Sequence, residues 1–244
     1  MDALIYTAMT GAERVMNAQQ VHANNLANLN TAGFRANMEQ AGSNEVQGYG
    51  YADRVLSSIS SDAVSGRGGA VQDTGRSLDV AVQGDGYFAV AQGGADGPEA
   101  YTRAGSFDVD ADGHLMLGRN AVLGEGGPIV LPPHTQVVIT SDGSVQVQTP
   151  DQNQLQTVDK LKLVKADARN LTKDEAGLLV PRDGQPLAAA DDVKVAGGKL
   201  ESSNVSAVEE MVSTMNLARD FDMQMRLYKA ADDMADAGDR LIRT

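Results

Sequence analysis

The sequence contains no cysteine and no tryptophan, and aromatic residues make up only 4% of its 244 residues. Without cysteine the chain forms no disulfide, offers no thiolate ligand to zinc and has no thiol nucleophile. Hydrophobic residues still reach 42%, which is too many for a wholly disordered chain. We therefore expect a folded core of aliphatic side chains, and the length allows a second structural unit.

Basic residues are few, because 20 Lys and Arg stand against 33 Asp and Glu, a formal net charge of −13. Nucleic-acid phosphates and anionic lipids repel such a chain, so we expect no nucleic-acid partner and no membrane insertion. No apolar run reaches the roughly 18 residues that a transmembrane helix needs. Residues 1–6 lack the basic and apolar regions of a secretory signal, so we expect any export to use another route.

Apolar residues near the start of the chain recur at spacings of three and four, which places them on one face of a helix. The pattern resembles the a/d seam of a coiled coil that is interrupted by Gln19 and His22. Gly33 ends the periodicity, so residues 1–35 are expected to form the N-terminal helix of a helical domain. The apolar members of this seam are Ile5, Ala8, Ala12, Val15, Leu26 and Leu29.

A second amphipathic pattern runs from about Val205 to Ile242. Ser206 followed by Glu209 matches a capping box at its start. A helix of about 38 residues extends roughly 57 Å, which is longer than a globular domain of this size normally needs. We expect residues 199–244 to supply the C-terminal helix of the same helical domain. Its candidate interface residues are Val208, Met211, Met215, Ala218, Phe221 and Met225.

Between the two ends the apolar period changes to two-residue alternation, as in Val137 with Ile139. Asp-Gly pairs supply the positive-φ residues of hairpin turns, at residues 85–86, 112–113, 142–143 and 183–184. Residues 76–198 are therefore expected to form an inserted antiparallel all-β domain. Residues 36–75, which are rich in Gly, Ser, Asn and Gln, are expected to form an extended connector. The predicted fold class is α+β.

Catalytic and metal-binding motifs are weak in this sequence. Asp108–Gly113 matches the first half of a calcium loop, but Arg119 stands at the twelfth position and repels the ion, so a hairpin turn fits better. The histidines His22, His114 and His134 show no paired metal-ligand spacing. No serine lies in a Gly-x-Ser-x-Gly elbow. We therefore expect no catalytic residue, no cofactor, no bound metal and no enzyme activity.

The apolar stripes at the two ends can be buried within one chain or between chains. The simplest arrangement is a helical pair that supports a globular core within one chain. Two such helices alone bury too little apolar surface to stand apart from the β domain. We therefore expect the terminal helices to assemble with neighbouring subunits.

Groups of residues at both ends and in the middle resemble the signature of the bacterial flagellar basal-body rod and hook family. They fall in family order, so the resemblance covers essentially the whole chain. The N-terminal group is Asn24, Asn25, Leu26, Ala27, Asn28, Thr31, Gly33, Phe34 and Arg35. The central groups are residues 86–90, residues 101–107, and Gly113 with Leu115. The C-terminal group is Leu200, Glu201, Ser202, Ser203, Asn204 and Val205, followed by residues 208–212.

The resemblance implies a structural subunit whose terminal helices pack into the inner tube of an axial drive shaft, with the β domains facing outward. Its partners would be copies of itself, other rod proteins and the flagellar type III export apparatus, and its location the rod within the periplasm. Residues 2–9 and 218–226 look most like a proximal rod component, with a distal rod component as the close second. Two hypotheses from different classes are a secreted calcium-binding β-rich enzyme or adhesin and a soluble hub with a coiled-coil arm.

Overall fold

The computed structural model describes residues 2–45, 55–150 and 154–242, and the side chains of 2–6, 41, 44, 55–62, 239, 241 and 242 lie outside this description. The chain divides into two compact units. No helix within the described ranges is long and apolar enough to cross a membrane. Unit 1 consists of Met1–Ala27, Asn37–Ala63 and Ser206–Thr244, and unit 2 consists of Asn28–Ala36 and Val64–Val205.

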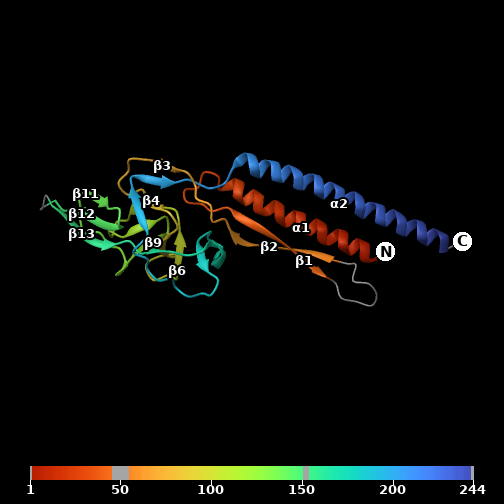
Figure 1. Cartoon of the computed structure of the whole chain (residues 1–244), viewed down its shortest axis with the longest axis horizontal. Coiled ribbons are helices and arrows are strands. Elements are labelled where there is room, and N and C mark those ends of the chain that lie inside the picture. Colours follow the sequence, from red (N-terminus) through yellow and green to blue (C-terminus); the bar gives the residue numbers. More distant parts are fainter. Residues whose placement is uncertain (1, 46–54, 151–153, 243–244) are drawn as a thin grey trace. The chain divides into compact units, whose positions relative to one another are not determined.

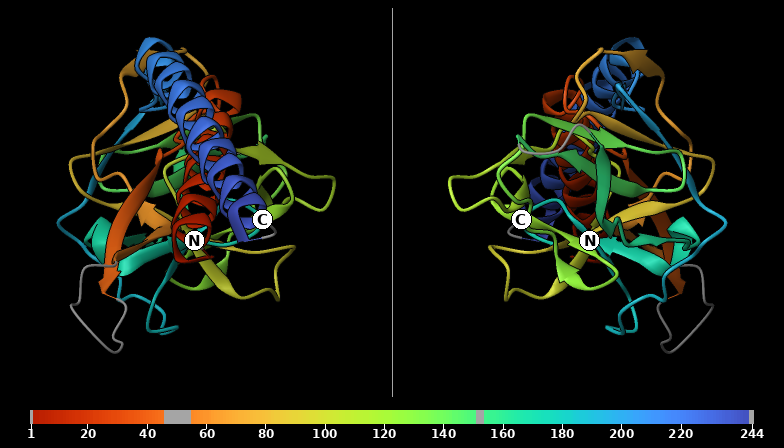
Figure 2. Two further views of the ribbon diagram at one scale, coloured as in Figure 1. Left: turned by 90° about the vertical axis from the view of Figure 1, so that its right-hand side faces the viewer. Right: turned by 90° about the vertical axis from the view of Figure 1, so that its left-hand side faces the viewer.

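Unit 1 is built around two long helices from opposite ends of the chain, α1 (Asp2–Ala27) and α2 (Ala207–Ile242). The helices lie side by side and antiparallel in all views, and the end of α2 extends past the start of α1 (Figures 1 and 2). With 26 and 36 residues they measure roughly 39 and 54 Å. A two-stranded sheet of β1 (Asn37–Glu45) and β2 (Val55–Val64) completes the described part of this unit.

Unit 2 is an assembly of antiparallel sheets, because alternating apolar residues and Gly-containing turns favour hairpins. Its largest sheet has nine strands in the order β15-β16-β6-β5-β9-β8-β7, with β10 paired to β9 and β14 to β5. These strands are β5 (Tyr87–Ala91), β6 (Glu99–Thr102), β7 (Asp108–Val109), β8 (Leu115–Leu117), β9 (Asn120–Gly124), β10 (Gly127–Pro128), β14 (Leu163–Val164), β15 (Leu171–Lys173) and β16 (Leu179–Pro181).

Three smaller sheets complete the described part of unit 2. The first has the strand order β11-β12-β13, and the other two are the pairs β17-β4 and β18-β3. A short 3-10 helix, η1, precedes β15. The bounds are β3 (Val71–Asp73), β4 (Val80–Gln83), β11 (Gln136–Ile139), β12 (Ser144–Gln148), β13 (Leu155–Lys160), η1 (Ala168–Asn170), β17 (Lys194–Gly197) and β18 (Lys199–Glu201).

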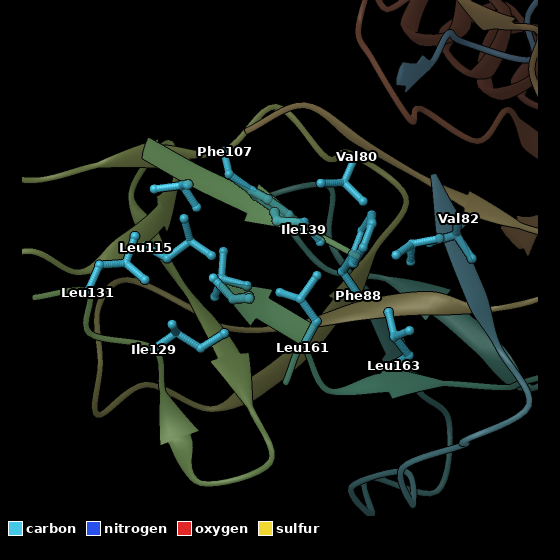
Figure 3. Packing of buried hydrophobic residues seen from close by; sticks show 14 of the residues in the cluster. Val80, Val82, Phe88, Phe107, Leu115, Ile129, Leu131, Ile139, Leu161 and Leu163 are labelled. Atoms are coloured by element: carbon cyan, nitrogen blue, oxygen red, sulfur yellow. The ribbon is translucent and has the colours of Figure 1, made fainter. Parts of the chain in front are cut away.

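Aliphatic side chains from several of these sheets share one hydrophobic core (Figure 3). Phe88 and Phe107 supply its aromatic contact, edge to face, with ring centroids 5.2 Å apart. The alternating residues of the predicted strands all point into this cluster. Its buried members are Val80, Val82, Phe88, Phe107, Leu115, Val122, Ile129, Leu131, Val137, Ile139, Val145, Val147, Leu161, Leu163, Val193 and Val195.

The predicted α+β class, with a helix at each end and an antiparallel β region between them, is confirmed. The predicted cap of the second helix is also present, because the Glu209 N–H donates to Ser206 Oγ at 3.4 Å. One position is wrong: Leu29 lies beyond the end of α1. The chain turns there, because the Thr31 N–H donates to the carbonyl oxygen of Asn28 at 3.2 Å.

Glycine at the predicted hairpin turns adopts positive φ at three of the four Asp-Gly pairs, with 88° at Gly113, 87° at Gly143 and 69° at Gly184. At residues 85–86 the prediction is wrong, since it is Gly84 that has positive φ, 74°. Gly86 provides space instead, because a Cβ atom there would lie 2.5 Å from Val193 Cγ1.

The expected domain limits remain a prediction, and the strand pairing lets us test them. Residues 36–75 contain β1, β2 and β3, and β3 pairs with β18 outside the 76–198 segment. We expect a fragment of residues 64–205 to melt at a clearly higher temperature than a fragment of residues 76–198. The shorter fragment loses the β3–β18 pair and the buried Glu201, and breaking such an ion pair costs about 3–5 kcal/mol. Equal melting temperatures by circular dichroism would show that β3 and β18 contribute nothing to folding.

Candidate assembly site

The two helices of unit 1 pack along a narrow face of α1 made of small and β-branched residues. Ala8, Val15, Ala18 and Val21 are buried there, each 7% exposed or less. The helices approach closely at Gly11, where a Cβ atom would lie 3.0 Å from Gln224 Oε1. On α2, Leu217, Phe221, Ala231 and Ala235 are half-buried or buried. This contact makes an antiparallel helical pair within a single chain.

A polar cluster closes one end of the helical pair. Asn25, only 2% exposed, donates from Nδ2 to Glu210 Oε1 at 3.1 Å and to the Asn37 carbonyl at 3.0 Å, and its Oδ1 accepts the Asn37 N–H at 2.8 Å. His22 Nδ1 lies 2.5 Å from Glu210 Oε2. The amide of Asn25 therefore joins α1, α2 and the start of β1. His22, which interrupts the apolar seam in the sequence, makes its contact within the chain.

A stripe of apolar residues on α2 stays exposed in the single chain. Its members recur at spacings of three, four, three and seven residues along the helix. Among its four large side chains the exposed fraction runs from 46% at Met225 to 72% at Val208, and Ala218 is also exposed. We call this surface the α2 stripe, and it consists of Val208, Met211, Met215, Ala218 and Met225.

The remaining seam residues are placed differently from one another. Ala12 and Leu26 are half-buried on α1, and Leu29 is half-buried in unit 2. The side chain of Ile5 lies outside those that the structure describes. Ala8 and Val15 are buried within the chain, so the burial expected for them is met without a second subunit. Ala18 and Val21 belong to the same face but were not among the predicted interface residues.

A groove remains between the two helices of unit 1. Its volume is about 520 Å³, and Ala8, Gly11, Val15, Leu217 and Leu227 are among its lining residues. A native core leaves few voids larger than a water molecule. This groove differs from such a void, because it is open to solvent and its lining includes polar residues such as Arg14 and Asp220.

In unit 2, residues from all three family-like groups meet at a site that we call the motif junction, which consists of Gly33, Phe34, Arg35, Arg103, Glu201 and Asn204. Gly33 has φ of 67°, and its N–H donates to the Glu201 carbonyl at 2.7 Å. Asn204 Oδ1 accepts the Ala36 N–H at 2.7 Å, while its own N–H donates to the Phe34 carbonyl at 3.2 Å. Backbone and side-chain hydrogen bonds thus join the segment that follows α1 in the sequence to the segment that precedes α2.

A buried ion-pair cluster lies at the centre of the motif junction. Arg35 Nη2 is 2.9 Å from Glu201 Oε1, and Arg103 Nη1 is 3.1 Å from Glu201 Oε2. All three residues are 5% exposed or less. Burial lowers the pKa of Arg103 and Glu201 opposes this shift, but an arginine this basic stays protonated. Arg103 also donates to the carbonyl oxygen of Gly84 at 2.5 Å.

A lysine extends the junction on its other side. Lys173 Nζ lies 3.6 Å from the centroid of the Phe34 ring and donates to the Arg35 carbonyl at 2.6 Å. Burial lowers the pKa of Lys173 to about 8. The contact stabilises the turn after α1.

The one group of described residues that could hold a metal ion is Asp110, Asp112 and His114, at the turn between β7 and β8. Asp110 Oδ1 accepts the backbone N–H groups of Asp112 and His114, at 3.0 and 2.7 Å. Burial would raise the pKa of the Asp110 carboxyl, but these hydrogen bonds outweigh it and lower the pKa. The carboxylate is therefore already used in shaping an exposed hairpin turn, as the sequence predicted.

Comparison with known proteins agrees with this arrangement. Three family models match the chain. The model for flagella basal body rod proteins matches residues 5–35, and the model for the D1 domain of the flagellar hook proteins FlgE/F/G matches residues 81–147. The model for the C-terminal region of the flagellar basal body rod FlgEFG proteins matches residues 196–241. The flagellar basal-body rod protein FlgF of Escherichia coli K12 is 38% identical over 250 residues, and that of Salmonella typhimurium LT2 is 37% identical over 250 residues; each match covers 99% of both chains. FlgG of Bacillus subtilis 168 is 34% identical over 166 residues, which covers 59% of this chain and 60% of that protein.

The chain has a helix at each end and a β region between them, and its FlgF relatives match 99% of its length. Together with the three family models, these features define a structural rod protein. The chain belongs to the flagellar basal-body rod protein family. Within this family it is most like FlgF.

The turn at Gly33 gives a direct test of the motif junction. A Cβ atom at this position would lie 2.1 Å from the Ala104 nitrogen, in addition to the strain of positive φ. We expect Gly33→Ala to destabilise unit 2 by roughly 2–5 kcal/mol, the sum of about 1–2 for the left-handed conformation and 1–3 for overpacking. Urea unfolding of the full chain, followed by circular dichroism, measures the change.

Gly177 provides the matched control. Its φ is 80°, and nothing lies within 4 Å of the position that a Cβ atom would take. Gly177→Ala should therefore cost only the conformational part, about 1–2 kcal/mol. An equal loss of stability in the two variants would show that the junction yields easily at Gly33.

Proposed function

We propose that this chain is a structural subunit of the proximal part of the flagellar rod, the axial shaft that transmits motor torque for motility. Full-length similarity to proteins named FlgF supports this function over that of a calcium-binding enzyme or adhesin. Export through the flagellar type III apparatus and a final position in the periplasm are part of the proposal. A chain without cysteine suits that route, since it can be threaded unfolded without forming disulfides.

The α2 stripe is the surface by which we propose that subunits assemble. Large exposed apolar patches on a soluble protein mark interaction sites, and this stripe follows a helical period along α2. Three of its five residues are methionines, whose flexible side chains adapt to more than one partner. Burying one such side chain contributes about 1.5–3 kcal/mol, so a repeated stripe supplies a strong driving force.

The groove between α1 and α2 supports the same proposal. Met9 and Met16 on α1 are 44% and 52% exposed, so apolar surface remains on both helices. Side chains of neighbouring helices that filled the groove would bury this apolar surface. The α1 residues Ala8 and Val15 would then contribute mainly to packing within the subunit, and the α2 stripe to packing between subunits.

Met215 is the position at which assembly and folding can be separated. It is 55% exposed in the single chain, so Met215→Asp should leave the melting temperature of the monomer nearly unchanged. In the assembled rod the new carboxylate would be buried without a partner, which costs several kcal/mol. We expect loss of swimming and loss of the subunit from purified basal bodies, measured in a strain that lacks its own copy.

Two control variants isolate the cause. Met215→Leu keeps the apolar surface and should swim normally. Asn216→Asp adds the same charge at the neighbouring exposed position outside the α2 stripe and should be mild. Unfolding of the isolated Met215→Asp monomer would instead show that Met215 belongs to a core within one chain.

Deletion of the gene tests the position in the rod. Cells without a proximal subunit should form basal bodies with an incomplete rod and no hook, as seen by electron microscopy. Intact, rotating flagella in such cells would contradict a rod function altogether. The gene can also be placed in strains that lack either the proximal or the distal rod protein. If it restored swimming only to the strain that lacks the distal protein, a distal position would be favoured.

A further inference from the structure

A cavity of about 520 Å³ lies in unit 2 beside the motif junction. It reaches the surface between exposed residues, among them Gly68, Gln83 and Asp85, and its inner wall includes Arg35 and Arg103. Its volume falls within the roughly 300–1,000 Å³ that small-ligand sites occupy. The cavity is therefore large enough for a guest and has charged groups at its base.

The guanidinium groups at the base of the cavity have unused hydrogen-bond donors. Among the described residues, no partner is found for Arg35 Nε, Arg35 Nη1 or Arg103 Nε. Arg35 and Arg103 are 3% and 5% exposed. Buried donors of this kind are nearly always paired in folded proteins, so three on adjacent arginines point to an acceptor that the chain itself does not supply.

The net charge of the buried ion-pair cluster also indicates an acceptor that the chain does not supply. Two buried guanidinium groups share the single buried carboxylate of Glu201, so these three residues together carry one positive charge, and the other carboxylate that lines the cavity is that of the exposed Asp85. One Glu201 oxygen is used further, since Oε1 accepts the Gly69 N–H at 2.8 Å. Burying an uncompensated charge is unfavourable, and one added anion would make the cluster neutral.

One of the unpaired donors, Arg35 Nη1, lies behind the cavity wall at Gly68. A Cβ atom on Gly68 would lie 3.9 Å from Arg35 Nη1 and 3.8 Å from Glu201 Oε1, with nothing else within 4 Å. Lys199 also lines the cavity, although its Nζ pairs with Asp73 at 2.9 Å, and Asp85 carries a negative charge at the rim. The guest must therefore be small, with its charge directed inward to the arginines. A carboxylate matches the planar fork of a guanidinium group.

We propose that this cavity binds a carboxylate, and that in the rod the carboxylate is an acidic side chain of an adjoining subunit. The second statement rests on the proposed function. Copies of a chain with net charge −13 repel one another when they pack together, and 33 acidic residues offer many possible guests. A buried basic cavity that accepts one of them would replace a repulsion by an attraction at each contact.

The first experiment tests the cavity in the full-length protein with acetate as the probe. Nitrogen-15 NMR follows the Nε–H signals of Arg35 and, as an internal control, of the exposed Arg119. At constant ionic strength, acetate should shift the Arg35 signal saturably and leave that of Arg119 in place, while chloride should do neither. No saturable shift, an equal shift with chloride, or a response to phosphate alone would overturn the carboxylate site, whatever the protein does in the rod.

The second experiment fills the cavity from within. Gly68→Asp places a carboxylate near Arg35, and Gly68→Asn is the neutral variant of the same shape. Compared with Gly68→Asn, we expect Gly68→Asp to melt a few degrees higher, to lose the acetate-dependent shift and to reduce swimming several-fold. Equal melting together with an unchanged acetate response would overturn the site.

The swimming assay separates the two statements. If acetate binds but Gly68→Asp cells swim like Gly68→Asn cells, the guest is a free carboxylate and the contact between subunits is overturned. Failure of the proposed function has a different signature, because the deletion strain would then swim without any copy of the gene.

Discussion

The carboxylate of Glu201 between the guanidinium groups of Arg35 and Arg103 connects three stretches of chain that are remote in sequence. The segment that follows α1 supplies Arg35, the β6 end supplies Arg103, and the segment that precedes α2 supplies Glu201. Because these charges are buried, each is tolerated only while its partner is in place. The turn at Gly33 and the start of the path into α2 are therefore fixed by one electrostatic cluster.

Much of the fold could be predicted from periodicity. The spacing of three and four residues continues long enough to indicate α2 almost to its ends, and Val145 with Val147 shows the strand alternation clearly. The end of α1 could not be read in this way, because Leu29 continues the apolar spacing while the hydrogen bond from Thr31 to Asn28 turns the chain. The strand β1 was missed because it contains Gly, Asn, Glu and Ala, which have low β propensity, and its pairing with β2 comes from context.

The candidate site was predictable only in part. The family-like residues pointed to Asn25 and Glu201, but a sequence does not reveal which charges meet across 98 positions, as Arg103 and Glu201 do. In the sequence, Asn25 is a polar residue near the end of the predicted helix. Only the structure shows that its amide is buried and joins three elements. The α2 stripe was visible as a period, whereas its exposure depends on which residues of α2 are covered by α1. Leu217 and Ala231 turned inward, and the methionines remained outside.

The unequal lengths of α1 and α2 affect how copies of the chain can add to a polymer. Gly11 lies opposite Gln224 and His22 opposite Glu210, so the last turns of α2 continue past the first turn of α1. One end of the helical pair is thus a single helix, while the other is closed by the Asn25 cluster. A contact that joins one kind of end to the other is heterologous, because two different surfaces meet in it. A polymer joined through them has a direction, and its two tips present different surfaces to whatever adds next.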